Sequence, residues 1–135
     1  MVQTISILLI ENQPLTRLGV RAVVSGEADI ELIGETDNPT DGFGMFRDLN
    51  PDVTILGLRF PDSCSIDDLD NYFTERPKAK VIVLAEHAGD AEILKALKKG
   101  AAGYICKDVS PDNCSLRYEL WLRAASTFRM RSLRY

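Results

Sequence analysis

Apolar runs alternate with amphipathic stretches along the chain. Three runs, residues 5–10, 53–56 and 81–84, are almost entirely apolar. A run without polar alternation is typical of a strand buried on both faces of a parallel sheet. Residues 30–33 and 104–106 are shorter candidates of the same kind. The pattern predicts five strands of one sheet whose two faces are both covered.

Between these runs, apolar side chains recur every three or four residues, which places them on one face of a helix. The predicted faces are Leu15, Leu18, Ala22 and Val23; Phe43, Phe46 and Leu49; Ile66, Leu69 and Phe73; Ile93, Leu94 and Leu97. Gly100 follows the fourth face and is the expected stop of that helix.

A fifth helix is predicted near the end of the chain. Residues 110–112 combine a capping serine, a proline at the first helical position and an acid. The apolar side chains after this start are spaced four and three residues apart, as in a narrow packing seam. They are Cys114, Tyr118, Trp121, Ala125 and Phe128. We expect one domain over residues 1–128 and a basic tail over residues 129–135.

Strand and helix therefore alternate five times. Because crossovers between parallel strands are right-handed, this order predicts an α/β fold with a doubly wound, five-stranded parallel sheet of the flavodoxin-like kind. Ligands of such folds bind at the carboxyl ends of the strands. This rule directs attention to residues 11–13, 57–59, 85–87 and 107–108.

Composition narrows the functional classes. The chain has 135 residues, 45% of them hydrophobic and 27% charged, as expected for one globular domain. The net charge of −4 argues mildly against nucleic-acid binding by the whole surface. No apolar run is long enough to span a membrane, and no signal peptide is evident. Three cysteines without CxxC spacing indicate reduced thiols in the cytoplasm.

Four segments, in order, resemble the NarL/FixJ branch of the response-regulator receiver family. Residues 7–15, ILLIENQPL, are similar to its first strand and acidic turn, usually written VDDHPL. Residues 29–35, DIELIGE, resemble its second strand. Residues 51–61, PDVTILGLRFP, look like PDVVLLDLRMP, and residues 99–108, KGAAGYICKD, look like KGAxGYLLKD. The resemblance implies a CheY-like fold and an ancestry in phosphorelay signalling and transcription regulation.

The resemblance also implies a phosphorylation site. In this family two acids hold Mg²⁺, an aspartate ending the third strand accepts the phosphoryl group, and a hydroxyl and a lysine bind its oxygens. Lys107 matches the lysine, and Tyr104 matches an aromatic residue that acts as a switch. Glu11 and Asn12 match the acidic pair, although Asn12 has no charge.

Two matches fail. Gly57 stands where the phosphate-accepting aspartate belongs, and Ala85 stands where the hydroxyl belongs. We therefore expect a degenerate phosphorylation pocket with no catalytic residue and no cofactor. Its members are Glu11, Asn12, Gly57, Ala85 and Lys107. Glu11 remains as a weak Mg²⁺ candidate, since one acid gives this ion little reason to shed water.

Several side chains have a structural interpretation beside the functional one. A Glu11–Lys107 ion pair is favoured over an anion site, and a packing role is favoured for Tyr104. Cys106 is expected to be a buried thiol rather than a redox sensor, and His87 a surface loop residue. The other acids after the third strand, Asp62, Asp67 and Asp68, are expected to lie too far from Lys107 to replace the acceptor.

The favoured function is a non-enzymatic signalling module that binds a second copy or another protein. The seam residues Tyr118, Trp121 and Phe128 are the expected interface, since exposed aromatic side chains often anchor binding. DNA contact is expected only through a helix-turn-helix domain of roughly 60 residues, which the sequence after residue 128 cannot hold. The alternatives are a conventional phosphorelay receiver with another acceptor and a small ligand-binding flavodoxin-like protein.

Overall fold

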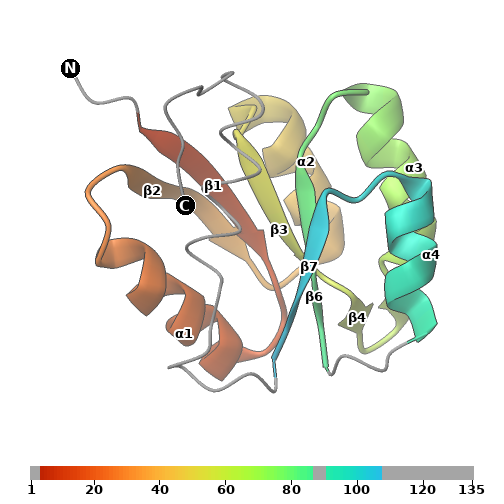
Figure 1. Cartoon of the computed structure of the whole chain (residues 1–135), viewed down its shortest axis with the longest axis horizontal. Helices are drawn as coiled ribbons and strands as arrows, with labels where there is room; N and C mark the ends of the chain where they lie inside the picture. The colour runs from red at the N-terminus through yellow and green to blue at the C-terminus, as the bar shows by residue number, and fades with distance from the viewer. Residues whose placement is uncertain (1–3, 87–90, 108–135) are drawn as a thin grey trace, which may run out of the picture.

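The fold has three layers, with a parallel β-sheet between helices on both faces (Figure 1). The structure is a computed structural model that describes residues 4–86 and 91–107. The sheet strands are β1 (Ile5–Ile10), β2 (Ile30–Thr36), β3 (Val53–Gly57), β6 (Val81–Ala85) and β7 (Gly103–Cys106). The helices are α1 (Pro14–Ser25), α2 (Pro39–Leu49), α3 (Ile66–Glu75) and α4 (Ala91–Lys99).

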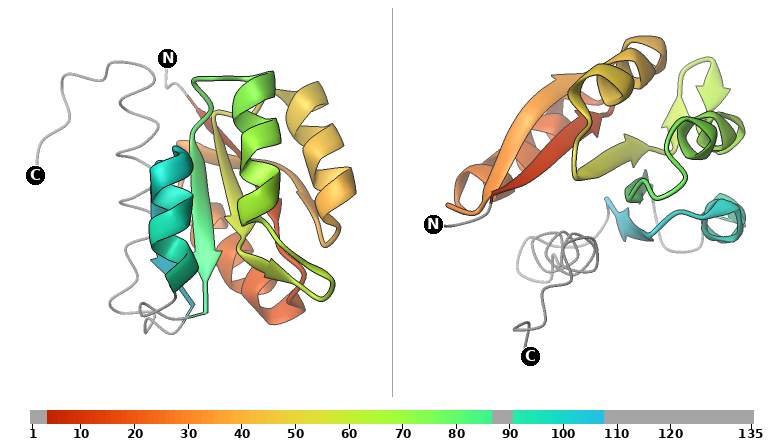
Figure 2. Two further views of the ribbon diagram at one scale, coloured as in Figure 1. Left: turned by 90° about the vertical axis from the view of Figure 1, so that its right-hand side faces the viewer. Right: turned by 90° about the horizontal axis from the view of Figure 1, so that it is seen from above.

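The strand order is β2-β1-β3-β6-β7, and every neighbouring pair is parallel. Chain order is reversed at β1, because β2 lies on one side of β1 and β3 lies on the other. Helix α1 packs on one face of the sheet, while α2, α3 and α4 cover the other (Figure 2). The predicted doubly wound five-stranded sheet is confirmed, and it brings the carboxyl ends of β1, β3, β6 and β7 to one edge.

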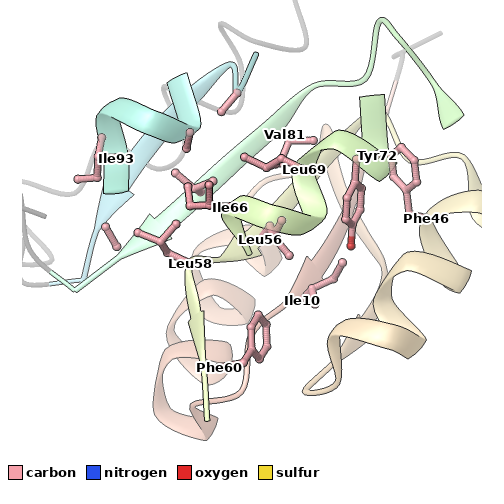
Figure 3. Close-up of a cluster of buried hydrophobic side chains, with 14 of the residues drawn as sticks. Ile10, Phe46, Leu56, Leu58, Phe60, Ile66, Leu69, Tyr72, Val81 and Ile93 are labelled. Carbon is pink, nitrogen blue, oxygen red and sulfur yellow. The ribbon is translucent and has the colours of Figure 1, made fainter. Parts of the chain in front are cut away.

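Two hydrophobic clusters hold the layers together, one on each face of the sheet. On the side of α2, α3 and α4, the largest buried side chains include Phe46, Leu69 and Tyr72 (Figure 3). On the side of α1, the buried residues come from alternate positions of the same strands, such as Ile7 and Leu9. Both faces of the central strands are therefore covered, which explains their nearly continuous apolar sequence.

The structure lengthens some predicted strands and adds a hairpin. Strand β2 continues to Thr36 instead of ending at residue 33. Two short antiparallel strands, β4 (Arg59–Phe60) and β5 (Ser63–Cys64), follow β3 and were not predicted. Gly100 ends α4 as expected and has a φ of +122°, a conformation that glycine adopts without a steric penalty.

The predicted face of α1 is wrong except at Val23, which packs against the buried cluster on that side of the sheet. Leu15 is 82% exposed and Leu18 53% exposed, whereas Val20 and Val24 are buried. Helix α1 carries two apolar stripes, and the β-branched one packs on the sheet. The remaining helix faces are correct in part. Leu49 and Leu94 are exposed, and Tyr72 is buried although it was not predicted. The other predicted residues that are buried or pack against the core are Phe43, Phe46, Ile66, Leu69, Phe73 and Ile93.

The fifth helix, its seam of Tyr118, Trp121 and Phe128, the basic tail and His87 lie outside the described residues. Within residues 4–86 and 91–107, no helix is long and apolar enough to cross a membrane.

Candidate functional site

The predicted site residues meet at the carboxyl edge of the sheet. Glu11 directly follows β1, Gly57 ends β3, Ala85 ends β6 and Lys107 directly follows β7. The backbone fixes their relative positions, because the Lys107 N–H donates to the Ala85 carbonyl oxygen at 2.8 Å. The four residues come from distant parts of the chain but lie on adjacent parallel strands.

Glu11 and Lys107 form a largely buried ion pair, and the sequence predicted the pairing. Lys107 Nζ donates to Glu11 Oε2 at 2.9 Å, and the two side chains are 13% and 0% exposed. The Gln13 N–H donates to the same oxygen at 3.0 Å. A pair that water hardly reaches is screened far less than a surface pair, so it holds both side chains in place.

Two further partners of Lys107 were not predicted. Its ammonium group donates to Gln13 Oε1 at 2.8 Å and contacts Glu86 Oε2 at 3.4 Å. A lysine has three N–H donors, and Glu11, Gln13 and Glu86 together match that number. Both residues lie in the strand junctions that the sheet topology singles out, although their side-chain directions cannot be read from the sequence.

Gly57 lies directly against the Glu11 carboxylate. A Cβ atom built on Gly57 would overlap Glu11 Oε1 and would lie 3.3 Å from both Glu11 Cδ and the Ile10 carbonyl oxygen. Glu11 Oε1 is buried and has no hydrogen-bond partner among the described residues. The Glu11 side chain thus fills the space that any larger residue at position 57 would need.

The other members of the predicted pocket contribute little chemistry. Ala85 is fully buried and offers no hydroxyl, and Asn12 is partly exposed beside Glu11. Tyr104 is 41% exposed on β7, and the packing role expected for it stays a prediction. Cys106 is a buried thiol, as expected.

The donor set does not fit Mg²⁺. This ion prefers octahedral oxygen ligands and commonly one or two free carboxylates. Glu11 already bonds Lys107 through Oε2, and Gly57 supplies no side chain. Nowhere in residues 4–86 and 91–107 do three or more His, Cys, Asp or Glu side chains gather in a way that could hold a metal.

The three acids considered as substitute acceptors follow β3 but play no part in the Lys107 ion pairs. Lys107 pairs with Glu11 and Glu86. Asp62 and Asp67 are exposed, and Asp68 lines a separate pocket between α2 and α3. Burial raises the pKa of Asp68, and the charge of Asp67 raises it further.

Comparison with known proteins identifies the family. The model of the response regulator receiver domain matches residues 7–119, which is most of the chain. The chain belongs to the response-regulator receiver family. This receiver domain is therefore a regulatory module of two-component signalling.

Its relatives are response regulators of the NarL type. The nitrate/nitrite response regulator protein NarL of Escherichia coli (strain K12) is 32% identical over 108 residues, 80% of this chain and 50% of that protein. The transcriptional regulatory protein MctR of Rhizobium johnstonii is 35% identical over the same length, with the same coverage. The receiver domain spans about half the length of these relatives.

Solved structures agree on the fold. A two-component response regulator of the LuxR family from Aurantimonas sp. SI85-9A1 superposes with a TM-score of 0.83 at 23% identity. The match covers 92% of this chain and 87% of that one. The CheY-like architecture expected from the sequence is confirmed.

Proposed function

We propose that this receiver domain acts in the cytoplasm without a phosphorylated aspartate and regulates transcription through contact with a second copy or another protein. In this proposal it is not an enzyme. One observation supports it above others: the Glu11 carboxylate lies against Gly57, at the position that the family resemblance assigns to the acceptor, and pairs with Lys107.

The chemistry of the site disfavours phosphoryl transfer. Gly57 has no side chain to attack a phosphoryl donor. Phosphoryl transfer depends on positive charge placed around the transferred group, but Lys107 is already neutralised by Glu11 and Glu86. An entering phosphoryl group would have to break the buried pair and come to rest beside two carboxylates.

Activity must then be set by the sequence instead of by phosphate. A ligand shifts an equilibrium only through its different affinities for the two states. Without a phosphate site, the Glu11–Lys107 pair fixes one arrangement of the carboxyl edge. We propose that this arrangement binds its partner constitutively and that Tyr118, Trp121 and Phe128 supply the interface. In this proposal, DNA contact requires a separate helix-turn-helix domain. The relative MctR is named a transcriptional regulatory protein.

Treatment with acetyl phosphate and Mg²⁺, followed by intact-mass spectrometry, tests the proposal. We expect no phosphoryl adduct and no change in sedimentation. We also expect a dimer at tens of micromolar that Trp121→Ala weakens. An adduct that is lost at alkaline pH would overturn the phosphate-independent mechanism. A monomeric wild-type chain would redirect the search to a different protein partner.

Matched variants separate the missing acceptor from the blocking side chain. Gly57→Asp alone should remain unmodified, because its Cβ would overlap the Glu11 carboxylate. The variant Glu11→Asp, Asn12→Asp, Gly57→Asp, Ala85→Thr restores the acids, the acceptor and the hydroxyl beside Lys107. We expect that variant alone to gain the alkali-labile adduct. Equal labelling of both variants would show that Glu11 does not block the position.

A further inference from the structure

A pocket separate from the site around Glu11 and Lys107 lies between α2, α3 and the β4–β5 hairpin. Its volume is about 360 Å³, within the range of sites that hold small molecules. It shares no lining residue with the site around Glu11 and Lys107. Its lining includes Thr40 and Phe43 of α2, Ser63 of the hairpin, and Asp68, Asn71 and Tyr72 of α3.

Aromatic rings form a fixed wall of this pocket. The Phe43 ring meets the Tyr72 ring edge to face, with centroids 5.1 Å apart, and Phe46 packs against Tyr72 at 4.7 Å. Arg76 lies 4.4 Å above the Phe46 ring and donates to the Phe46 carbonyl oxygen at 3.3 Å. These contacts join α2 to α3, so the wall does not depend on a ligand to form.

The Tyr72 hydroxyl lacks a partner. Tyr72 is 1% exposed, and its oxygen has no hydrogen-bond partner among the described residues. In Figure 3 this oxygen points away from Phe46 and toward Ile10 and Phe60. Buried polar groups are nearly always hydrogen-bonded. The hydroxyl is also sealed from solvent, so within the described part of the chain it is an unsatisfied polar group inside the wall of the pocket.

The charge of the lining selects the ligand. Asp68 lies one helical turn before Tyr72 and lines the same pocket. It is the only formally charged side chain among the described lining residues, and no cation balances it there. Burial and the charge of Asp68 raise the pKa of Tyr72, so the phenol keeps its proton and stays neutral. The pocket therefore combines one negative charge, neutral polar groups and aromatic faces.

We propose that this pocket binds a small organic cation, a primary ammonium group attached to a compact apolar body. The ammonium group donates to the Asp68 carboxylate, beside the Tyr72 ring in the pocket wall. The apolar body lies on the Phe43 ring, where a nearby cation also gains from the face of the ring. Phosphates and carboxylates are disfavoured because Asp68 would repel them.

Titration of the ¹⁵N-labelled 135-residue chain with benzylammonium at pH 7 tests this inference. We expect saturable amide shifts confined to residues 40–43, 63 and 68–72, with a dissociation constant on the order of 1 mM for so small a probe. Benzoate and benzyl alcohol share the ring but lack the positive charge, so we expect both to bind at least tenfold more weakly, roughly the effect of one charged hydrogen bond.

Three isosteric variants locate the contacts. Asp68→Asn should weaken benzylammonium binding roughly tenfold, as expected for losing a charged hydrogen bond. Tyr72→Phe removes a hydroxyl that is sealed from the pocket, so we expect it to change the affinity less than about twofold. Asp67→Asn makes the same charge change on the exposed neighbour and should alter the affinity less than about twofold. Absent or dispersed shifts would overturn the inference. So would equal binding of benzoate, or equal effects of Asp67→Asn and Asp68→Asn. Tyr72→Phe should fold normally, because it removes a buried group that has no partner.

Discussion

Removing the positive charge of Lys107 should expose how strongly the buried pair holds this domain together. In Lys107→Met the Glu11 carboxylate stays fully buried but, among the described residues, keeps only the Gln13 N–H as a partner. Breaking a buried ion pair from one side costs about 3–5 kcal/mol, since it leaves an uncompensated charge. A domain of this size is commonly stable by about 5–15 kcal/mol, so the loss is a large fraction of the total.

Urea unfolding followed by far-ultraviolet circular dichroism measures this loss. With a slope of about 2 kcal/mol per molar urea, a loss of about 4 kcal/mol lowers the midpoint by roughly 2 M. Lys95→Met is the matched control, because Lys95 pairs with Glu92 at 3.1 Å but is 64% exposed. An exposed pair contributes at most about 1 kcal/mol, so the control midpoint should move by less than about 0.5 M.

A double variant tests the cause. Glu11→Gln with Lys107→Met removes both charges and keeps similar shapes, so it should recover most of the stability that Lys107→Met loses. If Lys107→Met costs no more than Lys95→Met, the reasoning about burial is refuted. A double variant whose loss equals the sum of both single losses would also refute it, because independent sites add.

Two further predictions concern α2 and α3. Gly42→Ala should lower stability by about 1–3 kcal/mol by urea unfolding, since its Cβ would lie 2.6–2.8 Å from three atoms of Ile10. Gly44→Ala in the same helix has open space and should instead raise stability by up to about 1 kcal/mol; a gain at both positions would contradict the close approach of α2 to β1. By carboxyl NMR, Asp68 should titrate above 3.8, and Asp67→Asn should lower its pKa without removing the part due to burial. Because folding raises this pKa, the folded state binds more protons, and this contribution to stability falls as the pH rises from 3.8 through the folded pKa. An Asp68 pKa at or below 3.8 would contradict its placement.

The strands were predictable because burial on both faces leaves little ambiguity. A mostly apolar run such as residues 5–10 suits a strand covered on both faces, whichever face its side chains point to. Helix α1 was less predictable, because Leu15 and Leu18 compete with Val20 and Val24 as the buried stripe. Spacing alone cannot say which stripe faces the sheet. The β4–β5 hairpin has strands of two residues, too short to show any periodicity.

Part of the site could also be predicted from the sequence. The rule that ligands bind at carboxyl ends of parallel strands brings Glu11, Gly57 and Lys107 together. The contacts of Gln13 and Glu86 with Lys107 depend on side-chain directions in loops, which no pattern encodes. The fit between Glu11 and Gly57 depends on a single methylene, the difference between glutamate and aspartate. Whether the longer side chain reaches Gly57 can be judged only once the distance between β1 and β3 is known.

The contact between Glu11 and Gly57 also limits how the sequence can change over time. An acid restored at position 57 would meet the Glu11 carboxylate, so that step first passes through a strained protein. Shortening Glu11 first would leave a gap of about one methylene, at a cost of about 1 kcal/mol, with no gain until position 57 also changes. Each single step therefore costs stability on its own, and a paired change avoids both costs. Such a site tends to stay as it is long after the selection that produced it has ended.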